Sequence, residues 1–317
     1  MAAIKRTLPS LRDALHVATS LWLFTADDMF SIMIPNVVCS LLIAVTGSPF
    51  GPAIAYTQLA ARTHAVVAWV WINLLFFNVS NQLQDESIAE DRENKPWRPL
   101  ASRRISQPQA RVLYMALWPT VWVISSLTGG ILPSISLQLL GFAYNELQMG
   151  EQWWFRNCIN AGGYISFLLG AVQAALGTFR LQYSELALRW LLLVAGAVTT
   201  GIHAMDLYDQ VGDAKRERKT IPLVWGDRWA RRSIVTSVSL VSLNAARAIG
   251  AGSSASAGPS IVLAAVIAAR LTERAPACVR EDKTTFKIWC LWIISLYLVP
   301  VLDTLIVRTT TMQPPRR

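Results

Sequence analysis

Long apolar stretches run through almost the whole chain, and each is about as long as a bilayer-spanning helix. An α-helix needs about 20 consecutive apolar residues to cross the hydrocarbon core of a bilayer. Nine such stretches lie near residues 29–47, 64–80, 109–128, 131–149, 159–179, 186–206, 231–250, 258–273 and 286–307. The sequence therefore predicts an all-α integral membrane protein with about nine transmembrane helices in a bundle.

The composition favours a membrane protein over a soluble one. Of the 317 residues, 53% are hydrophobic and 15% are charged, whereas soluble domains have about 25% charged residues. Before the first stretch, the segment His16–Asp28 mixes aromatic and acidic residues, which predicts an interfacial helix rather than a cleavable signal. No separate soluble domain is recognisable, so residues 1–317 are expected to form a single transmembrane domain in the lipid bilayer.

The net charge of +9 is explained by membrane orientation rather than by nucleic-acid binding. With nine spans, one side of the membrane would hold all but seven of the 29 Lys and Arg residues. The other seven are Arg62, Arg180, Arg189, Arg247, Arg308, Arg316 and Arg317. Cytoplasmic loops of membrane proteins carry the excess of Lys and Arg. The side with the N-terminus is therefore predicted to be cytoplasmic, and no nucleic-acid partner is expected.

The cysteines and histidines carry no metal or disulfide pattern. The four cysteines are scattered without a Cys-x-x-Cys pair, and the three histidines are far apart in the sequence. Neither a zinc site nor a disulfide framework is expected.

Two long polar loops interrupt the apolar pattern, at about 81–108 and 206–232. They follow the second and the sixth apolar stretch. Because four spans separate them, an even number, both loops are predicted to emerge on the same face of the membrane, the cytoplasmic one.

The first loop opens with an acidic cluster at the end of a membrane helix. Asn81 and Asp85 are four residues apart, so on a continuous helix they share a face. Glu90 and Asp91 lie off that face. They are expected to join it only if the helix unwinds near Ala89.

The second loop opens with three carboxylates at helical spacing. Asp206, Asp209 and Asp213 stand at i, i+3 and i+7, which places them on one face, and Lys215 is the first of several basic residues that follow. The cluster itself contains no countercharge.

Like charges on one helix face repel by a few tenths of a kcal/mol per pair in water, and a single acid at mid-bilayer depth costs about 2.5–3.5 kcal/mol. Mg²⁺ offsets this cost, because it binds carboxylate oxygens together with substrate phosphates. Two alternatives stay open. The loops could be solvated cytoplasmic surface, or the acids could mark a transporter pathway, although they lie at helix ends rather than at the midplane.

The first cluster resembles the first motif of the UbiA superfamily of membrane prenyltransferases. Asn81, Asp85 and Arg98-Pro99 match that motif in register. Two positions depart from it, since Gln82 and Ala89 stand where the superfamily has aspartates.

The second cluster resembles the second UbiA motif. Asp209, Asp213 and Lys219-Thr220 match it, while Glu217 stands where a glycine is expected. The two motifs and the nine-span pattern together cover nearly the whole chain.

The departures themselves resemble a fungal branch of the superfamily. The segments that carry this resemblance are 21–28, 34–36, 81–82, 90–99, 156–164 and 209–227. This branch includes membrane-bound terpene cyclases.

The resemblance implies an enzyme in which Mg²⁺ and basic residues remove the diphosphate of an isoprenoid substrate and leave an allylic cation. The first expectation is a terpene cyclase that converts farnesyl diphosphate to a sesquiterpene. An aromatic prenyltransferase of fungal secondary metabolism is the alternative, and a non-enzymatic transporter or scaffold is the third. The resemblance also implies residence in the endoplasmic reticulum.

The expected site is a central cavity capped by the two polar loops. Its metal residues are Asn81, Asp85, Glu90, Asp91, Asp206, Asp209 and Asp213, of which Asn81, Asp85, Asp209 and Asp213 are also the expected catalytic residues. The candidates for the diphosphate are Lys95, Arg98, Lys215 and Lys219, with Arg156 and Asn157 also expected to face the site.

Overall fold

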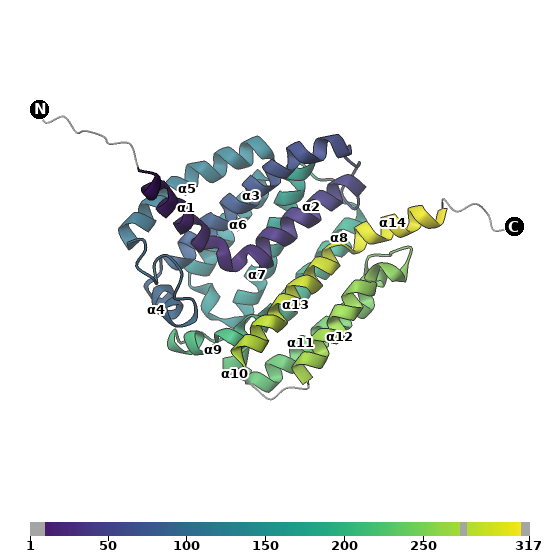
Figure 1. Ribbon diagram of the computed structural model, residues 1–317. Helices are drawn as coiled ribbons and strands as arrows, with labels where there is room; N and C mark the ends of the chain where they lie inside the picture. The colour runs from purple at the N-terminus through teal and green to yellow at the C-terminus, as the bar shows by residue number, and fades with distance from the viewer. Residues whose placement is uncertain (1–9, 273–277, 312–317) are drawn as a thin grey trace, which may run out of the picture.

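The computed structural model describes residues 10–272 and 278–311, which fold as an all-α protein. Their helices are α1 (Leu11–Thr25), α2 (Ile34–Thr46), α3 (Tyr56–Gln82), α4 (Asp85–Asn94), α5 (Gln107–Thr128), α6 (Ile131–Asn145), α7 (Trp153–Leu176), α8 (Glu185–Gly201), α9 (Asp206–Lys215), α10 (Ile221–Trp225), α11 (Asp227–Ala248), α12 (Gly258–Thr272), α13 (Val279–Tyr297) and α14 (Val299–Thr311). The long helices lie side by side, and the short helices α4, α9 and α10 gather at one end of the bundle (Figure 1).

The predicted apolar stretches all fall on helices, and the membrane class agrees with them. Within the described residues, six helical segments are long and apolar enough to cross a membrane, and the count is seven if the pair α13 and α14, bent by 49°, forms one span. The helix α6 has 15 residues, and α11 carries several arginines. Neither meets that standard, so the count of nine spans stays a prediction.

Helix α7 lies at the centre of the bundle, where it packs against α2, α3, α6 and α8. Small residues allow the close approach. A Cβ built at Gly170 would lie 2.0 Å from the Trp69 ring of α3, and Trp69 is fully buried. Only glycine fits beneath this indole, so the large buried side chain fixes the distance between α3 and α7.

The first helical segment is broken before it enters the bundle. A 3₁₀ turn at Ala26–Asp28 and a π-helical turn at Met29–Met33 separate α1 from α2. Pro35 has no N–H to donate to the carbonyl of Ser31, which disfavours a regular α-helix here. The segment predicted to be an interfacial helix lies on α1 and this break, and by length and composition α1, the break and α2 together form one of the candidate spans, Leu11–Thr46. The basic residues Lys5 and Arg6, which enter the charge argument, lie outside the described part of the chain.

The first polar loop contains a helix of its own. Helix α3 ends at Gln82, and α4 begins at Asp85 after a break of two residues. The condition for Glu90 and Asp91 to join the face of Asn81 and Asp85, unwinding near Ala89, is not met, because α4 is continuous from Asp85 to Asn94. The break occurs earlier, at Leu83 and Gln84, and it turns α4 so that it packs against α9.

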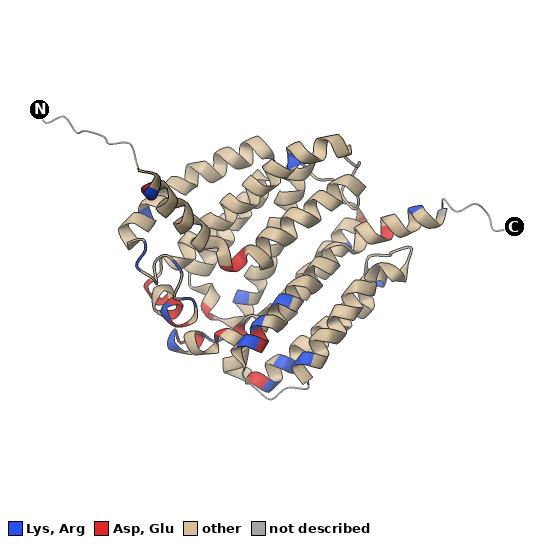
Figure 2. Cartoon of the chain, viewed as in Figure 1, with Lys and Arg blue, Asp and Glu red and all other residues tan. Residues whose placement is uncertain are grey.

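Charged residues are concentrated at the end of the bundle that holds α4, α9 and α10 (Figure 2). The two polar segments, far apart in the sequence, meet there. We call α4 with the turn that follows it, residues 85–104, the first polar segment. Helix α9 and the turn to α10, residues 206–220, form the second polar segment.

Candidate functional site

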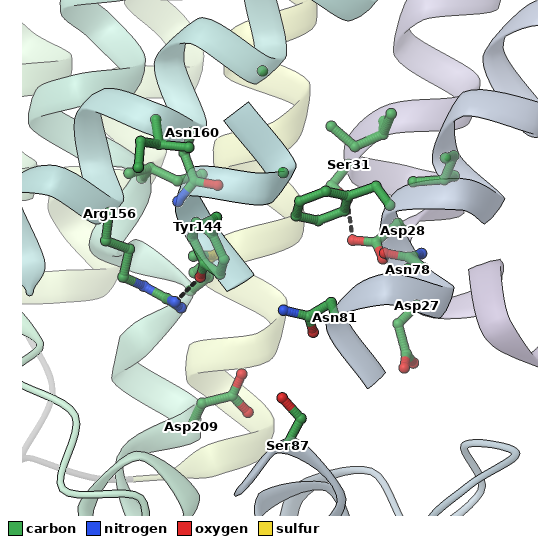
Figure 3. Close-up of a pocket in the computed structure, with 18 of the residues that line it drawn as sticks. Asp27, Asp28, Ser31, Asn78, Asn81, Ser87, Tyr144, Arg156, Asn160 and Asp209 are labelled. Carbon is green, nitrogen blue, oxygen red and sulfur yellow. Dashed lines mark hydrogen bonds between the residues drawn. The ribbon is translucent and has the colours of Figure 1, made fainter. Parts of the chain in front are cut away.

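A cavity opens at the charged end of the bundle and extends between the long helices. It encloses about 1220 Å³ of space, part of it open to solvent. Its charged lining residues are Asp27, Asp28, Glu90, Asp91, Lys95, Arg98, Arg156, Asp209 and Arg218. Its apolar and aromatic lining residues include Leu74, Phe77, Leu137, Leu140, Tyr144, Ile159, Tyr164, Phe167, Ile202, Met205, Tyr208 and Phe286. The cavity thus joins a charged mouth to an apolar interior. Figure 3 shows Arg156, Tyr144 and Asn160 on one side of the cavity and Asp27, Asp28 and Asn78 on the other.

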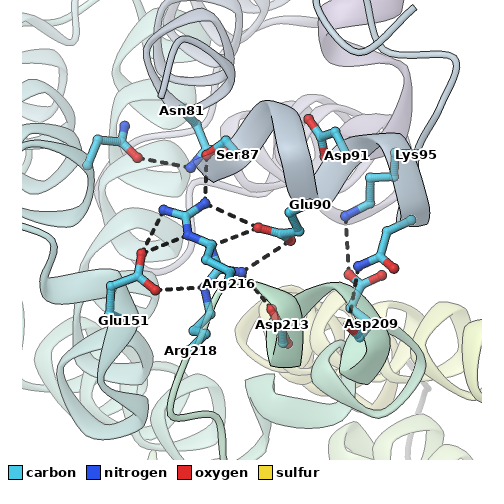
Figure 4. A network of polar contacts seen from close by, with 12 residues as sticks. Asn81, Ser87, Glu90, Asp91, Lys95, Glu151, Asp209, Asp213, Arg216 and Arg218 are labelled. Atoms are coloured by element: carbon cyan, nitrogen blue, oxygen red, sulfur yellow. Dashed lines mark hydrogen bonds and ion pairs between the residues drawn. The ribbon is translucent and has the colours of Figure 1, made fainter. Parts of the chain in front are cut away.

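Ion pairs connect the two polar segments at the mouth (Figure 4). The Lys95 ammonium lies 3.1 Å from a carboxylate oxygen of Asp209. The guanidinium of Arg218 lies between two acids, 2.7 Å from Asp213 and 3.2 Å from Glu90. The predicted approach of the two acidic clusters is therefore present, and basic residues stand between the carboxylates.

Arg216 extends this network away from the cavity. Its guanidinium donates to the Ser87 hydroxyl at 2.6 Å and pairs with Glu90 at 3.1 Å and with Glu151 at 2.6 Å. Helix α9 ends at Lys215, and Glu217 then adopts a φ of 57°. This left-handed conformation favours glycine, which accounts physically for the glycine expected at this position. The turn directs Arg216 and Arg218 toward α4.

A third cation joins the first polar segment to the break between α1 and α2. Arg98 donates from Nε to Asp27 at 3.0 Å and from Nη1 to Asp91 at 3.0 Å. The indole of Trp97 donates to the same Asp27 carboxylate at 3.1 Å. Asp28 lies beside Asp27 and accepts from the Asn78 amide at 2.9 Å. The helix break thereby contributes two acids to the cavity wall.

On the opposite wall, Arg156 from α7 pairs with the buried Asp206 at 3.0 Å and donates to the Tyr144 hydroxyl. The second carboxylate oxygens of Asp206 and Asp213 are buried and have no hydrogen-bond partner among the described residues. Orphaned carboxylate oxygens are costly in a buried site, and a bound cation would offset that cost.

The pKa values of three acids at the mouth are shifted in different directions from their ordinary values. Burial and the neighbouring Asp206 raise the pKa of Asp213 to about 7. Burial also raises the pKa of Asp91, with Arg98 opposing. For Glu90, burial alone would raise the pKa, but Arg218 and Lys95 outweigh it and hold the pKa below its ordinary value. A divalent cation near Asp213 would favour the ionised carboxylate.

The mouth offers oxygen donors suited to Mg²⁺. Asn81, Glu90, Asp91 and Asp209 all line the cavity. In the described part of the chain, no three acids or histidines lie close enough together to form a protein-only metal cage. Mg²⁺ commonly takes only one or two carboxylates and completes its shell with water and substrate phosphate. The residues present therefore fit a metal that binds together with a diphosphate.

The structure brings some expected site residues to the cavity and leaves others outside. Asp206 and Asp213 lie directly behind the lining residues, paired with Arg156 and Arg218. Asn157 is buried, but its amide donates to the Thr199 carbonyl at 3.0 Å, and it does not line the cavity.

Asp85, Lys215 and Lys219 are exposed and do not line the cavity. The expectation that Asn81 and Asp85 share one helix face is wrong, because the break at Leu83 places them in different helices. Asp85 instead accepts from the Gln107 side chain at 2.6 Å. Lys215 pairs with Glu93 at 2.6 Å on the surface.

Sequence reasoning missed four residues that line the cavity, namely Asp27, Asp28, Tyr144 and Arg218. It also missed Arg216, which lies outside the lining and pairs with the lining residue Glu90. The second motif predicts Lys219, and the basic run after the acidic cluster adds Lys215. The left-handed turn at Glu217 instead brings Arg216 and Arg218 to α4. The adjacent acids at 27 and 28, next to an apolar stretch, were the available signal for the helix break.

Comparisons with known proteins identify the family. Residues 32–291 match the UbiA prenyltransferase family. The chain is 31% identical over 220 residues to the fumagillin beta-trans-bergamotene synthase of Aspergillus fumigatus, covering 68% of this chain and 70% of that protein. It is 29% identical over 217 residues to the somaliensene A/B synthase of Streptomyces somaliensis, covering 68% of each. It is 26% identical to a polyprenyl transferase of Hericium erinaceus, covering 74% of this chain and 77% of the other.

Solved structures show the same fold. A UbiA homolog from Archaeoglobus fulgidus, solved with GPP and Mg²⁺, superposes with a TM-score of 0.64 at 15% identity and covers 88% of this chain and 98% of its own. A UbiA homolog from Aeropyrum pernix gives a TM-score of 0.54 at 17% identity, covering 90% and 98%. With the family match over most of the chain, the conclusion is plain: this protein is a multi-pass membrane enzyme of the UbiA prenyltransferase family.

Proposed function

We propose that this enzyme is a Mg²⁺-dependent terpene cyclase that ionises farnesyl diphosphate and cyclises its chain to a sesquiterpene. The observation that carries the proposal is the cavity, which joins a charged mouth to an apolar, aromatic interior. Two relatives named as terpene synthases support it. The sequence segments typical of the fungal cyclase branch support the farnesyl chain.

The cations at the mouth suit the diphosphate group. Lys95, Arg98, Arg156 and Arg218 line the cavity, and each now pairs with an acid. Guanidinium groups bind phosphate oxygens in a bidentate manner. A diphosphate that arrives with divalent cations can exchange partners with these ion pairs, taking the basic residues while the carboxylates bind the metal. Such an exchange leaves no buried charge without a partner.

The metal would be held by Asn81, Glu90, Asp91 and Asp209, with Asp206 and Asp213 behind them. Bound there, Mg²⁺ supplies Lewis-acid stabilisation of the negative charge on the leaving diphosphate. The arginines on both sides of the mouth add fixed positive charge to the same oxygens.

The interior suits the carbocation that remains. In ionisation, the bond between the allylic carbon and the diphosphate oxygen breaks, and the electron pair leaves with the diphosphate. Phe77, Tyr164, Phe167 and Phe286 surround the space beyond the mouth. Their ring faces stabilise a cation and exclude water. Attack by a double bond of the same chain closes the ring, and loss of a proton from the final cation gives a neutral hydrocarbon.

Product analysis tests the proposal. Purified protein is incubated with farnesyl diphosphate and Mg²⁺, with and without an aromatic acceptor such as 4-hydroxybenzoate, and the extract is analysed by gas chromatography and mass spectrometry. The expected result is a cyclic hydrocarbon in the absence of acceptor. A prenylated product that forms only with the acceptor would establish an aromatic prenyltransferase instead, the activity class suggested by the transferase relative.

We also propose that the mouth faces the cytoplasm, with the endoplasmic reticulum as the membrane. The support is the concentration of Lys and Arg residues at the end of the bundle that holds the mouth (Figure 2).

A further inference from the structure

Two glycines line the cavity, and their surroundings differ. A Cβ built at Gly141 of α6 would lie 3.3 Å from the Phe77 ring, so an aromatic side chain already occupies that space. A Cβ built at Gly163 of α7 meets no atom within 4 Å. Both glycines belong to the lining of the same cavity. At Gly163 the wall therefore leaves open space that a side chain would fill.

Gly163 lies in the interior part of the cavity, on the face of α7 that also holds the mouth. Arg156, Asn160 and Gly163 stand at i, i+4 and i+7, and all three line the cavity. Figure 3 shows Arg156 and Asn160 on the same wall. At a rise of 1.5 Å per residue, Gly163 lies about 10 Å deeper along α7 than Arg156. Phe167 follows one turn further in.

Helix geometry does not require a glycine at this position. Gly163 lies inside the 24-residue helix α7 and has no positive φ. Its neighbour Gly162 is explained by packing, since a Cβ there would lie 3.0 Å from Leu140. Glycine disfavours a helix interior. Because glycine has no side chain, Gly163 leaves empty space in the cavity wall where another residue would place its side chain.

We propose that Gly163 sets the length of prenyl chain that the cavity accepts. With the diphosphate at the basic mouth, the space beside Gly163 receives the distal isoprene unit of a farnesyl chain. This inference rests on the proposed function, because it takes the mouth as the diphosphate site. A large side chain at 163 would fill the space and leave room for the shorter geranyl chain.

Binding measurements test this inference without requiring turnover. Wild type, Gly163→Ala and Gly163→Leu are titrated with the non-reactive thiolodiphosphate analogues of farnesyl and geranyl diphosphate in the presence of Mg²⁺. We expect Gly163→Leu to lower the farnesyl-to-geranyl affinity ratio at least about 10-fold, since one misplaced methylene in an apolar pocket changes discrimination about 10–200-fold. Gly163→Ala should lower the ratio less.

A matched control is available on α8. Gly196 also lies within a helix and has no atom within 4 Å of a built Cβ, but it is exposed and outside the cavity lining. Gly196→Leu should leave the ratio unchanged. Thermal unfolding of Gly163→Leu at or above the wild-type midpoint shows that the fold is intact, because leucine favours helix more than glycine does.

The outcomes separate this inference from the proposed function. If wild type binds the farnesyl analogue but makes no hydrocarbon from farnesyl diphosphate, the cyclase proposal fails, and a changed ratio in Gly163→Leu still supports the chain-length role. If Gly163→Leu weakens both analogues equally, or neither, the role of Gly163 is wrong. If wild type binds neither analogue, both proposals are wrong.

Discussion

The Lys95 ammonium and the Asp209 carboxylate lie 3.1 Å apart, although 114 residues separate them in the chain. Both side chains line the cavity, and they belong to different polar segments. This ion pair joins the turn after α4 to α9 at the mouth. A diphosphate and a metal ion that bind at the mouth would therefore exchange partners with this pair.

Asp209 and Asp85 give the sharpest comparison among the acids. We expect Asp209→Asn to lower turnover at least about 100-fold, because it removes an anionic ligand at the mouth. We expect Asp85→Asn to keep most of its activity, because Asp85 is exposed and bound to Gln107. Steady-state kinetics on farnesyl diphosphate measure both.

The reverse result has a definite meaning. If Asp85→Asn lost activity as fully as Asp209→Asn, Asp85 would act as the sequence motif implies. The first polar segment would then have to rearrange around Leu83 and Gln84 when substrate binds. Intact folding of both variants is checked by thermal unfolding in detergent.

Arg218 should matter for stability as well as activity. Removing one member of a buried ion pair destabilises a protein by about 3–5 kcal/mol, and Arg218→Met leaves both Glu90 and Asp213 without this partner. We expect a clearly lower unfolding temperature for Arg218→Met, partly restored in the double variant with Asp213→Asn.

The control for Arg218 is an exposed ion pair from the same segment. Lys215 pairs with Glu93, and their side chains are 55% and 46% exposed. Exposed pairs contribute about 0–1 kcal/mol, so Lys215→Met should leave the unfolding temperature nearly unchanged. Equal losses in Lys215→Met and Arg218→Met would contradict the account of the network.

The sequence predicts the helices well and their ends poorly. Every apolar stretch lies on a helix, and Asp206, Asp209 and Asp213 share the buried face of α9 as their spacing predicts. The end of α3 depends on distant partners, since the Gln82 amide donates to the Phe24 carbonyl and Gln107 donates to the Leu83 carbonyl. No local pattern encodes such contacts.

The residues that line the mouth also could not all be predicted from the sequence. Spacing alone cannot show which members of a basic run turn inward. The left-handed backbone conformation of Glu217 turns the chain so that Arg216 pairs with Glu90 and Arg218 pairs with Asp213. The contact between Asp27 and Arg98 joins residues 71 apart, and it depends on how the broken N-terminal helix packs.

Asp27 should position Arg98 for the diphosphate. Asp27→Asn weakens the hydrogen bonds that hold both Arg98 and Trp97. Hydrogen bonds to charged groups contribute about 1.5–3 kcal/mol, so we expect KM for farnesyl diphosphate to rise about 10-fold. Asp13→Asn, at the exposed N-terminal cap of α1, is the control and should not change KM. If Asp27→Asn left KM unchanged, the segment between α1 and α2 would not contribute to substrate binding.

The orientation can be measured by cysteine labelling in sealed microsomes, in a background with the exposed Cys158 and Cys278 replaced by serine. Lys215 and Gln182 are both exposed and lie on opposite ends of the bundle by the predicted topology. A membrane-impermeant maleimide should label Lys215→Cys at once and Gln182→Cys only after permeabilisation. The opposite order would place the mouth in the lumen.

Measuring diphosphate release and hydrocarbon formation together tests whether this enzyme ionises and cyclises farnesyl diphosphate. Purified protein receives farnesyl diphosphate and Mg²⁺ with no acceptor, and parallel samples contain EDTA. A Mg²⁺-dependent cyclase should give equal amounts of inorganic diphosphate and cyclic hydrocarbon, with both lost in EDTA and restored by excess Mg²⁺. Release of diphosphate with farnesol as the product, or a hydrocarbon yield that EDTA does not change, would contradict the proposed function.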